Sequence, residues 1–451
     1  MEERKENRLG TMPVNRLLVT MSFPIMISML VQALYNVVDS IFVVRVSEAA
    51  LTAVSLAFPA QNLMIAVSVG TAVGVNSLMS RRLGEKNYKD AALAAENGMF
   101  LTLLGSIAFA LFGLFGTRAF YSAFTKDPAL IEMGESYLSI VCVWSFGVFF
   151  AVMGERLVQV TGTSIYNMIS QTLGAVINII LDPILIFGLC GFPAMGVTGA
   201  AVATVIGQLA SMIVIFWCNH RFNHEVRMNF RGFRPNGRII AEIYRVGLPS
   251  ILMQAIGSVM TFAMNKILIM FSEVAVNVFG VYFKLQSFVF LPIFGLNNGM
   301  VPIIGYNFGA RCKERIFAAI RLAMIIAVCV MLCGTLVFQL LPEAILRVLF
   351  DASEEMVAVG VPALRTISYS FIMAAISIVL SGTFQALGVG VNSMMMSFCR
   401  QLVVLLPAAY LLGRFVSLDA LWWSFPIAEI IAMCMAVFLF WRLYQKRLRD
   451  L

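Results

Sequence analysis

Long apolar runs alternate with short polar connections along the whole chain. A helix that crosses a bilayer needs about 20 mostly apolar residues, and twelve such runs can be placed in the sequence. The connections leave little chain for a soluble domain. The pattern therefore predicts an all-α polytopic membrane protein with twelve transmembrane helices, centred near Met29, Ile65, Leu104, Ile140, Ala175, Val205, Ser258, Phe290, Val328, Ala374, Leu402 and Ala432.

The twelve runs fall into two halves that repeat each other. A nearly constant shift of about 225 residues brings identical residues into register over long stretches. Six helices return the chain to its starting side, so the halves share an orientation, and substrate is expected between them as in parallel-repeat transporters. The aligned residues include Pro24 with Pro249, Ser47 with Ser272, Gly70 with Gly295, Gly74 with Gly299, Gly84 with Gly309 and Gln159 with Gln385.

The repeat divides the chain into two pseudo-symmetric six-helix lobes. The polar, basic stretch from Asn219 to Asn236 is the longest connection and the boundary between them. The spacings Gly70–Gly74 and Gly295–Gly299 favour close helix packing, which is preferred here to a moving contact. The predicted regions are a cytoplasmic tail at 1–15, an N-lobe at 16–218, a cytoplasmic linker at 219–240, a C-lobe at 241–445 and a cytoplasmic tail at 446–451.

Composition agrees with the apolar pattern, and charge sets the orientation. The chain is 60% apolar and 12% charged, whereas soluble domains carry about 25% charged residues. About 24 of the 32 Lys and Arg, with Arg156 and Arg400 among them, are assigned to segments on the side of the termini, which is the bias of cytoplasmic segments. The net charge of +8 therefore indicates topology in a cell membrane, with both termini cytoplasmic, and no nucleic-acid partner. The Cys residues lie singly, which indicates neither a disulfide framework nor a zinc site.

One acidic residue stands alone in a long uncharged stretch. Between Arg156 and Arg221, Asp182 is the only Asp, Glu, Lys or Arg. A carboxylate inside a membrane helix costs about 2.5–3.5 kcal/mol, so it indicates a functional site. Asn178 lies one turn before it on the same face, and Pro183 leaves a backbone carbonyl without its helical donor. These oxygen donors suit a hard cation or a shared proton.

A second polar group lies in the first span. Gln32, Tyr35, Asn36 and Asp39 are spaced so that all four share one helical face. Such a face turns towards protein or water and not towards lipid. The alternative for Asp39 is an interfacial residue at the helix end, because Arg45 follows closely.

The sixth span returns a third candidate to the depth of Asp182. A short turn precedes Thr198 in the run Gly196-Val-Thr-Gly199, so its hydroxyl is placed to complete an oxygen shell around Asp182. The alternative role for this hydroxyl is a hydrogen bond to its own helix backbone.

Taken together, these motifs resemble the multidrug and toxic compound extrusion (MATE) family over nearly the whole chain. The resemblance implies two six-helix lobes and cation-coupled export of chemically varied, mostly cationic or amphiphilic organic compounds. It rests on the polar stripe from Gln32 to Asp39, the Asn178-x-x-x-Asp182-Pro183 run, the turn at Thr198 and the duplicated Pro24 and Pro249.

The resemblance also implies roles for individual residues. The Na⁺ or H⁺ site of the first lobe is assigned to Asp39, Asn178, Asp182 and Thr198. The adjoining substrate cavity is assigned to Gln32, Tyr35 and Asn36, and helix bending to Pro24 and Pro183. No cofactor beyond the coupling ion is expected, and we expect a monomer surrounded by membrane lipid.

The second half departs from the first. The repeat partner of Asp39 is Met264 and that of Asp182 is Ala408, so ion coupling is predicted to reside in the first lobe. Met264 and Glu429 are assigned to the substrate cavity.

Three charges stand well inside the helices of the second lobe. Lys284, Arg365 and Glu429 are hypothesised to meet at one depth and to neutralise one another, because unpaired charges there are costly. The alternative is that Glu429 anchors a cationic substrate directly.

Other function classes fit the sequence less well. It contains no HExxH run, Gly-x-Ser-x-Gly elbow or Walker loop, so an enzyme is not expected. A flippase for lipid-linked saccharides would use a related two-lobed bundle, but a pyrophosphate-linked lipid needs a basic groove where Asp39 and Asp182 make an acidic one. The preferred function is secondary active multidrug efflux by antiport with Na⁺ or H⁺, and the sequence leaves the ion open.

Overall fold

The computed structural model describes residues 7–223, 225–226 and 228–451, and these form an all-helical protein. Residues 1–6 of the predicted tail and residues 224 and 227 of the predicted linker lie outside the described part. The helices of the first half are α1 (Arg8–Thr11), α2 (Val14–Val46), α3 (Glu48–Gly84), α4 (Tyr88–Phe115), α5 (Thr117–Phe124), α6 (Pro128–Val143), α7 (Phe146–Gln159), α8 (Ile165–Phe187) and α9 (Val197–Phe222).

The second half begins with α10 after the connection between the lobes. Since α9 continues to Phe222 and α10 begins at Gly237, both ends of the predicted linker are helical. The helices are α10 (Gly237–Leu268), α11 (Glu273–Gly309), α12 (Lys313–Leu340), α13 (Pro342–Phe350), α14 (Glu354–Ser368), α15 (Phe371–Ala386), α16 (Gly390–Phe398), α17 (Leu406–Phe415), α18 (Leu418–Leu421) and α19 (Ser424–Leu443), with π-helical segments η1 (Cys399–Leu405) and η2 (Tyr444–Leu448).

The helices long enough to cross a membrane follow the predicted repeat. Within the described residues, 10 spans meet the length and apolarity of a membrane helix, and there are up to 12 if each of two bent helix pairs counts as one span. The pairs are α6 with α7, bent by 40°, and α14 with α15, bent by 48°. Their breaks, at Trp144 and Tyr369, occupy equivalent positions of the two halves. The bend is therefore duplicated along with the sequence.

Local signals at the helix starts are duplicated as well. Ser47 caps α3 and Ser272 caps α11, each accepting a hydrogen bond from a backbone N–H of the first turn. Glu48 and Glu273 follow, and an acidic residue in the first turn complements the helix dipole. The second membrane helix of each half thus starts in the same way.

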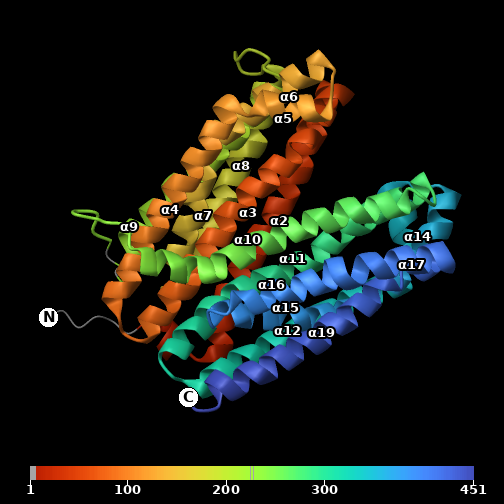
Figure 1. The fold of residues 1–451 in the computed structure, drawn as a ribbon. Coiled ribbons are helices and arrows are strands. Elements are labelled where there is room, and N and C mark those ends of the chain that lie inside the picture. The colour runs from red at the N-terminus through yellow and green to blue at the C-terminus, as the bar shows by residue number, and fades with distance from the viewer. Residues whose placement is uncertain (1–6, 224, 227) are drawn as a thin grey trace.

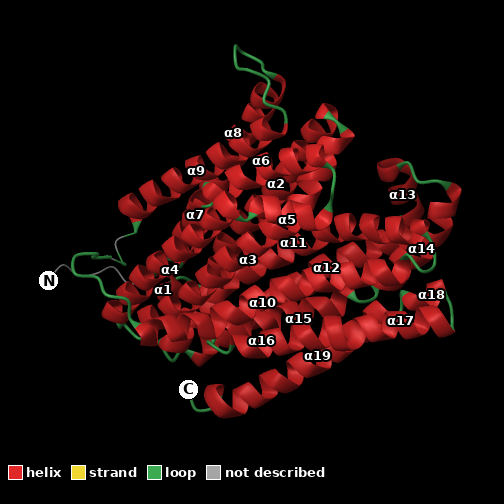
Figure 2. Ribbon diagram, turned by 45° about the horizontal axis from the view of Figure 1, so that its top comes forward, coloured by secondary structure: helices red, strands yellow, loops and turns green. Residues whose placement is uncertain are grey.

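The two halves form lobes that diverge from one end of the molecule. The C-terminus lies at the end where the lobes meet, and α6 and α14 lie far apart at the other end (Figure 1). The turned view shows that the helices run through each lobe and that the loops join their ends (Figure 2).

The first helix of each lobe begins in the core of the other lobe. Leu17, Leu18 and Met21 of α2 are buried in the hydrophobic core of the C-lobe. Conversely, Ile239 and Ile243 of α10 are buried in a core of the N-lobe. Burial of apolar surface contributes about 25 cal/mol per Å², so this exchange joins the lobes at the end that carries the termini.

Glycine allows the lobes to approach closely at this end. A Cβ on Gly84 of α3 would lie 1.9 Å from the carbonyl oxygen of Tyr306, and a Cβ on Gly309 of α11 would lie 2.0 Å from that of Arg81. Because the opposing atoms belong to the backbone, a side-chain rearrangement does not relieve either clash. The predicted small-residue motifs serve the same interface between lobes: Gly70 and Gly74 pack on α10, and Gly295 and Gly299 pack on α2.

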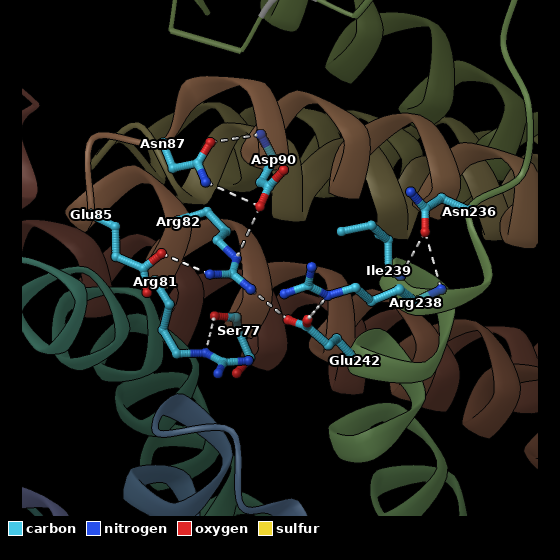
Figure 3. Close-up of polar contacts among 10 residues, drawn as sticks. All are labelled: Ser77, Arg81, Arg82, Glu85, Asn87, Asp90, Asn236, Arg238, Ile239 and Glu242. Atoms are coloured by element: carbon cyan, nitrogen blue, oxygen red, sulfur yellow. Dashed lines mark hydrogen bonds and ion pairs between the residues drawn. The ribbon is translucent and has the colours of Figure 1, made fainter.

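Charged side chains connect the lobes beside this crossing (Figure 3). Arg82 at the end of α3 donates through Nη2 to Glu242 of α10 and through Nη1 to Glu85, both at 2.8 Å. Asp90 Oδ2 lies 3.9 Å from Nε of Arg82. The Arg82–Glu242 ion pair therefore links an N-lobe helix to the first helix of the C-lobe.

Part of the predicted N-terminal tail lies between the lobes. Asn7 Nδ2 donates to the carbonyl oxygen of Val160 in the N-lobe at 2.9 Å. The carbonyl oxygen of Leu9 accepts from Asn307 at 3.1 Å and from Arg315 at 3.0 Å, and both donors belong to the C-lobe. The side chain of Leu9 is fully buried. This segment bridges the two lobes at their closed end.

Candidate functional site

A cavity of about 1380 Å³ lies between the lobes. Its N-lobe wall comes from α2, α3, α7, α8 and α9, and its C-lobe wall comes from α10, α11, α15, α16, η1 and α19. It exceeds the range of about 300–1,000 Å³ that is usual for small-molecule sites. Of the predicted cavity residues, Gln32, Tyr35 and Glu429 lie in the wall, as does Asn178 of the predicted ion site.

Asp39 of α2 and Asp182 of α8 come together beside this cavity. Their carboxyl groups are close enough to interact with each other, and the side chain of Asp182 is fully buried. Oδ1 of each is buried and has no hydrogen-bond partner in the described part of the chain. Two adjacent carboxylates repel each other when both are ionised, so this pair favours a shared proton or a bound cation.

Asn178 connects Asp182 to the neighbouring helix. In the amide orientation that satisfies both ends, Nδ2 donates to Asp182 Oδ2 at 3.2 Å and Oδ1 accepts from the backbone N–H of Thr204 at 3.1 Å. Asn178 is 2% exposed. The amide therefore fixes one oxygen of Asp182 and leaves the other free for a ligand.

The register of α8 and α9 brings Thr204, and not Thr198, to Asn178. Ser170 and Ser211 each donate to the carbonyl oxygen of the other at 2.8 Å, which sets the antiparallel register. Thr198 lies near the start of α9, half-buried, and no hydrogen bond joins it to Asp182 among the described residues. Thr204 was not predicted from the sequence, because its place depends on this register.

Two predicted cavity residues lie elsewhere. Asn36 is exposed on α2 and is outside the wall. Met264 is fully buried in the C-lobe core and does not line the cavity, because its face of α10 packs inward. On α10 the wall instead includes Thr261 and Asn265.

Pro24 and Pro183 both lie inside continuous helices, α2 and α8. Pro24 has no N–H to donate to the carbonyl of Thr20. The hydroxyl of Ser164 donates to the neighbouring carbonyl oxygen of Met21 at 2.5 Å and lies 3.4 Å from that of Thr20. Pro24 separates the start of α2, which is buried in the C-lobe core, from the half that carries Asp39. A change of bend at Pro24 would move one half relative to the other.

The cavity wall holds a buried pair of opposite charges in the N-lobe that the sequence reasoning missed. Glu155 accepts from Gln171 Nε2 at 2.8 Å, and Arg156 donates to Gln159 at 2.8 Å and to Asn298 of the C-lobe at 3.4 Å. Arg156 lines the cavity between the lobes, which corrects its assignment to a cytoplasmic segment. The sequence feature that could have identified this site is two adjacent charges flanked by apolar residues.

The hypothesised cluster of Lys284, Arg365 and Glu429 is wrong. Glu429 Oε1 accepts from Nη1 of Arg400 at 2.6 Å. Lys284 is exposed, and Arg365 donates to the backbone carbonyl of Gln339 at 3.3 Å. Arg400, assigned to a cytoplasmic segment from the sequence, lies in the cavity wall, because its helix carries it to the depth of Glu429.

Comparison with known proteins identifies the family. A family model described as MatE matches residues 24–184 and 249–411, one segment in each lobe. The chain belongs to the MatE family. This confirms the resemblance seen in the sequence and the multi-pass membrane fold, and it places the chain among transporters and not among enzymes.

Relatives of the MatE chain include a curated protein and solved structures. Multidrug export protein MepA of Staphylococcus haemolyticus is 28% identical over 432 residues, which cover 94% of this chain and 92% of that protein. A structure described as the outward-facing conformation of a multidrug resistance MATE family transporter of the MOP superfamily matches with a TM-score of 0.92 at 26% identity, covering 100% of both chains. A MOP superfamily transporter from Pyrococcus furiosus, described as having a binding pocket of reverse polarity, matches with a TM-score of 0.91 at 27% identity over 100% of both chains.

Proposed function

We propose that this MatE protein exports cationic or amphiphilic organic compounds by antiport with Na⁺ or H⁺. The observation that carries the proposal is the meeting of Asp39 and Asp182 beside a cavity between two lobes. Multidrug export is the function named for the relative from S. haemolyticus. Asp39, Asp182 and Asn178 form the ion site in this proposal, and Gln32 and Tyr35 face the organic substrate.

In this proposal, the side of the membrane that the closed end faces defines the transport state of the structure. Both termini are cytoplasmic, as the distribution of basic residues indicates. The end closed by α3, α10, α11 and the segment around Leu9 then faces the cytoplasm. The structure is accordingly the outward-facing state, in which the ion enters and substrate leaves.

Helix α2 transmits ion binding to the lobes. Its outer half carries Asp39, and its inner half is buried in the C-lobe core at Leu17 and Met21. A cation or proton removes the repulsion between Asp39 and Asp182 and stabilises one position of the outer half. Substrate stabilises the other state, because a ligand that binds both states equally shifts nothing.

The test is transport by the purified protein in proteoliposomes. A fluorescent organic cation is exported under a Na⁺ gradient or a pH gradient imposed separately, which also identifies the ion. We expect Asp39→Asn and Asp182→Asn each to lower gradient-driven transport at least about tenfold, since the site loses an ionisable oxygen donor. Full transport by both variants would refute the assignment.

A matched control separates charge removal at this site from charge removal in general. Asp351 is exposed between α13 and α14 with a φ of 47°, a conformation that Asn adopts readily. Asp351→Asn is therefore expected to transport like the unmodified protein in both gradients.

A further inference from the structure

The C-lobe wall of the cavity presents a basic group with unused donors. Arg400 lies in η1, a π-helical segment, and such segments occur frequently at functional sites. Its guanidinium has five N–H donors, and Nη1 makes one hydrogen bond, to Glu429 Oε1 of α19. No other hydrogen bond of the Arg400 side chain is found among the described residues.

The two members of this ion pair differ in exposure. The side chain of Arg400 is 27% exposed, whereas that of Glu429 is 13% exposed, and both line the cavity. Glu429 Oε2 is buried and has no hydrogen-bond partner in the described part of the chain. The carboxylate holds Nη1 of the guanidinium, and the remaining N–H groups of the partly exposed Arg400 are available to a ligand in the cavity.

Aromatic and amide side chains lie in the same cavity wall as Arg400. Phe283, Phe290 and Phe425 belong to the same wall, and Gln401 lies next to Arg400 with its Nε2 bonded to Ser397. A planar organic molecule can bury its rings against this wall while a polar group on it reaches Arg400.

We propose that Arg400, held by Glu429, is a subsite for the carboxylate of an amphoteric organic substrate, one that carries a carboxylate and a cationic group on an aromatic frame. The guanidinium fork matches a carboxylate, and the cationic group faces the N-lobe wall, which holds Glu155. This subsite rests on the proposed export function and adds a substrate class to it.

Neutralisation of the Arg400 charge by Glu429 determines which anions bind the subsite. The Arg400–Glu429 pair is neutral as a whole, so a small inorganic anion gains little net attraction and gives up its hydration. A carboxylate on an aromatic frame adds the burial of its rings against the wall. The subsite therefore selects organic carboxylates and not free ions.

A pair of dyes that differ in one group tests the subsite. A xanthene dye with a free carboxyl group is amphoteric, and its methyl ester is a cation of nearly the same shape. Fluorescence polarisation with the purified protein gives both dissociation constants, and their ratio, acid over ester, is the readout. In Arg400→Gln/Glu429→Gln this ratio should rise about tenfold or more, the loss expected for a charge-assisted hydrogen bond.

A second variant is expected to change the acid-over-ester ratio of dissociation constants in the opposite direction. Glu429→Gln retains Arg400 and removes the charge that neutralises it, so the acid should bind more tightly and the ratio should fall. This also covers the case in which the double variant does not fold. An exposed Arg–Glu pair outside the cavity provides the control: Arg347→Gln/Glu354→Gln, whose members are 42% and 82% exposed, should leave the ratio unchanged.

The outcomes separate this subsite from the export function. An unchanged ratio in both cavity variants overturns the subsite, as does a ratio that moves in the same direction in both. If the unmodified protein does not transport the ester under either ion gradient, the export function fails, whatever the dye ratio is.

Discussion

Asn178 is the residue on which the geometry of the acidic pair depends. Its amide joins Asp182 Oδ2 to the backbone N–H of Thr204, and all three groups lie between α8 and α9. Replacing the amide by an apolar group leaves a buried carboxylate oxygen without its partner, a change that costs about 1–3 kcal/mol.

We therefore expect Asn178→Leu to weaken the apparent affinity for the coupling ion about tenfold. Thr204→Val should have a smaller effect, because it removes only the Thr204 hydroxyl, which lies 3.3 Å from the side-chain amide of Asn178, and keeps the bond between that amide and Asp182. The dependence of transport rate on ion concentration measures both. Equal losses in the two variants would show that the Thr204 hydroxyl, and not the amide bridge, is required.

At the scale of single residues, the energetic cost of a charge inside a membrane helix pointed to the acidic pair. It did not point to Arg400. Asp182 was found because it is the only charge in a long apolar stretch, and Asp39 because it shares a face with other polar residues. Arg400 was assigned to a cytoplasmic segment because counting residues along the sequence does not show how deep a side chain lies in a membrane helix. Its partner Glu429 lies on the following span, and only packing brings the two together.

At the scale of helices, the repeat could be read from the sequence, but the exchange of first helices could not. The duplicated Ser47 and Ser272 caps and the two bent spans are local features that follow from similar sequences. That Leu17 is buried in the C-lobe, and Ile243 in the N-lobe, depends on which apolar faces meet. The apolar pattern of a helix does not specify which other helix it packs against.

Closure of the lobes at their closed end depends on the close packing of α3 against α11. Gly309→Val would place a Cβ against the carbonyl oxygen of Arg81, so the two helices must separate. We expect the closed end to open and the protein to shift towards the inward-facing state. After replacement of the exposed cysteines, spin labels on Lys89 and Glu314 should report longer distances between the lobes.

A milder variant calibrates this measurement. Glu242→Gln removes the ion pair with Arg82 but introduces no clash, and a partly exposed pair contributes only about 0.2–1 kcal/mol. Its distance distribution should lie between those of the unmodified protein and Gly309→Val. An unaltered distribution in Gly309→Val would show that α3 and α11 do not control closure.

At the scale of the whole molecule, Asp39 and the closed end belong to one connected unit. Helix α2 joins Asp39 to the C-lobe core, and the segment before it bonds Val160 of one lobe and Asn307 of the other. Rotation of the lobes that opens the terminal end must break one of these sets of bonds. The described residues before α2 thus connect the two lobes at this end, although their polar sequence predicted a tail.

Leu9→Asp tests this role of the N-terminal segment. Leu9 is fully buried, and its burial contributes about 1.5–3 kcal/mol, so a carboxylate there should detach the segment and favour opening by about tenfold or more. The same spin-label pair, on Lys89 and Glu314, measures the change, and gradient-driven export should slow with it. Arg8→Gln, at the exposed neighbouring position, should change neither. If Leu9→Asp matches that control in both measurements, the segment does not contribute to closure.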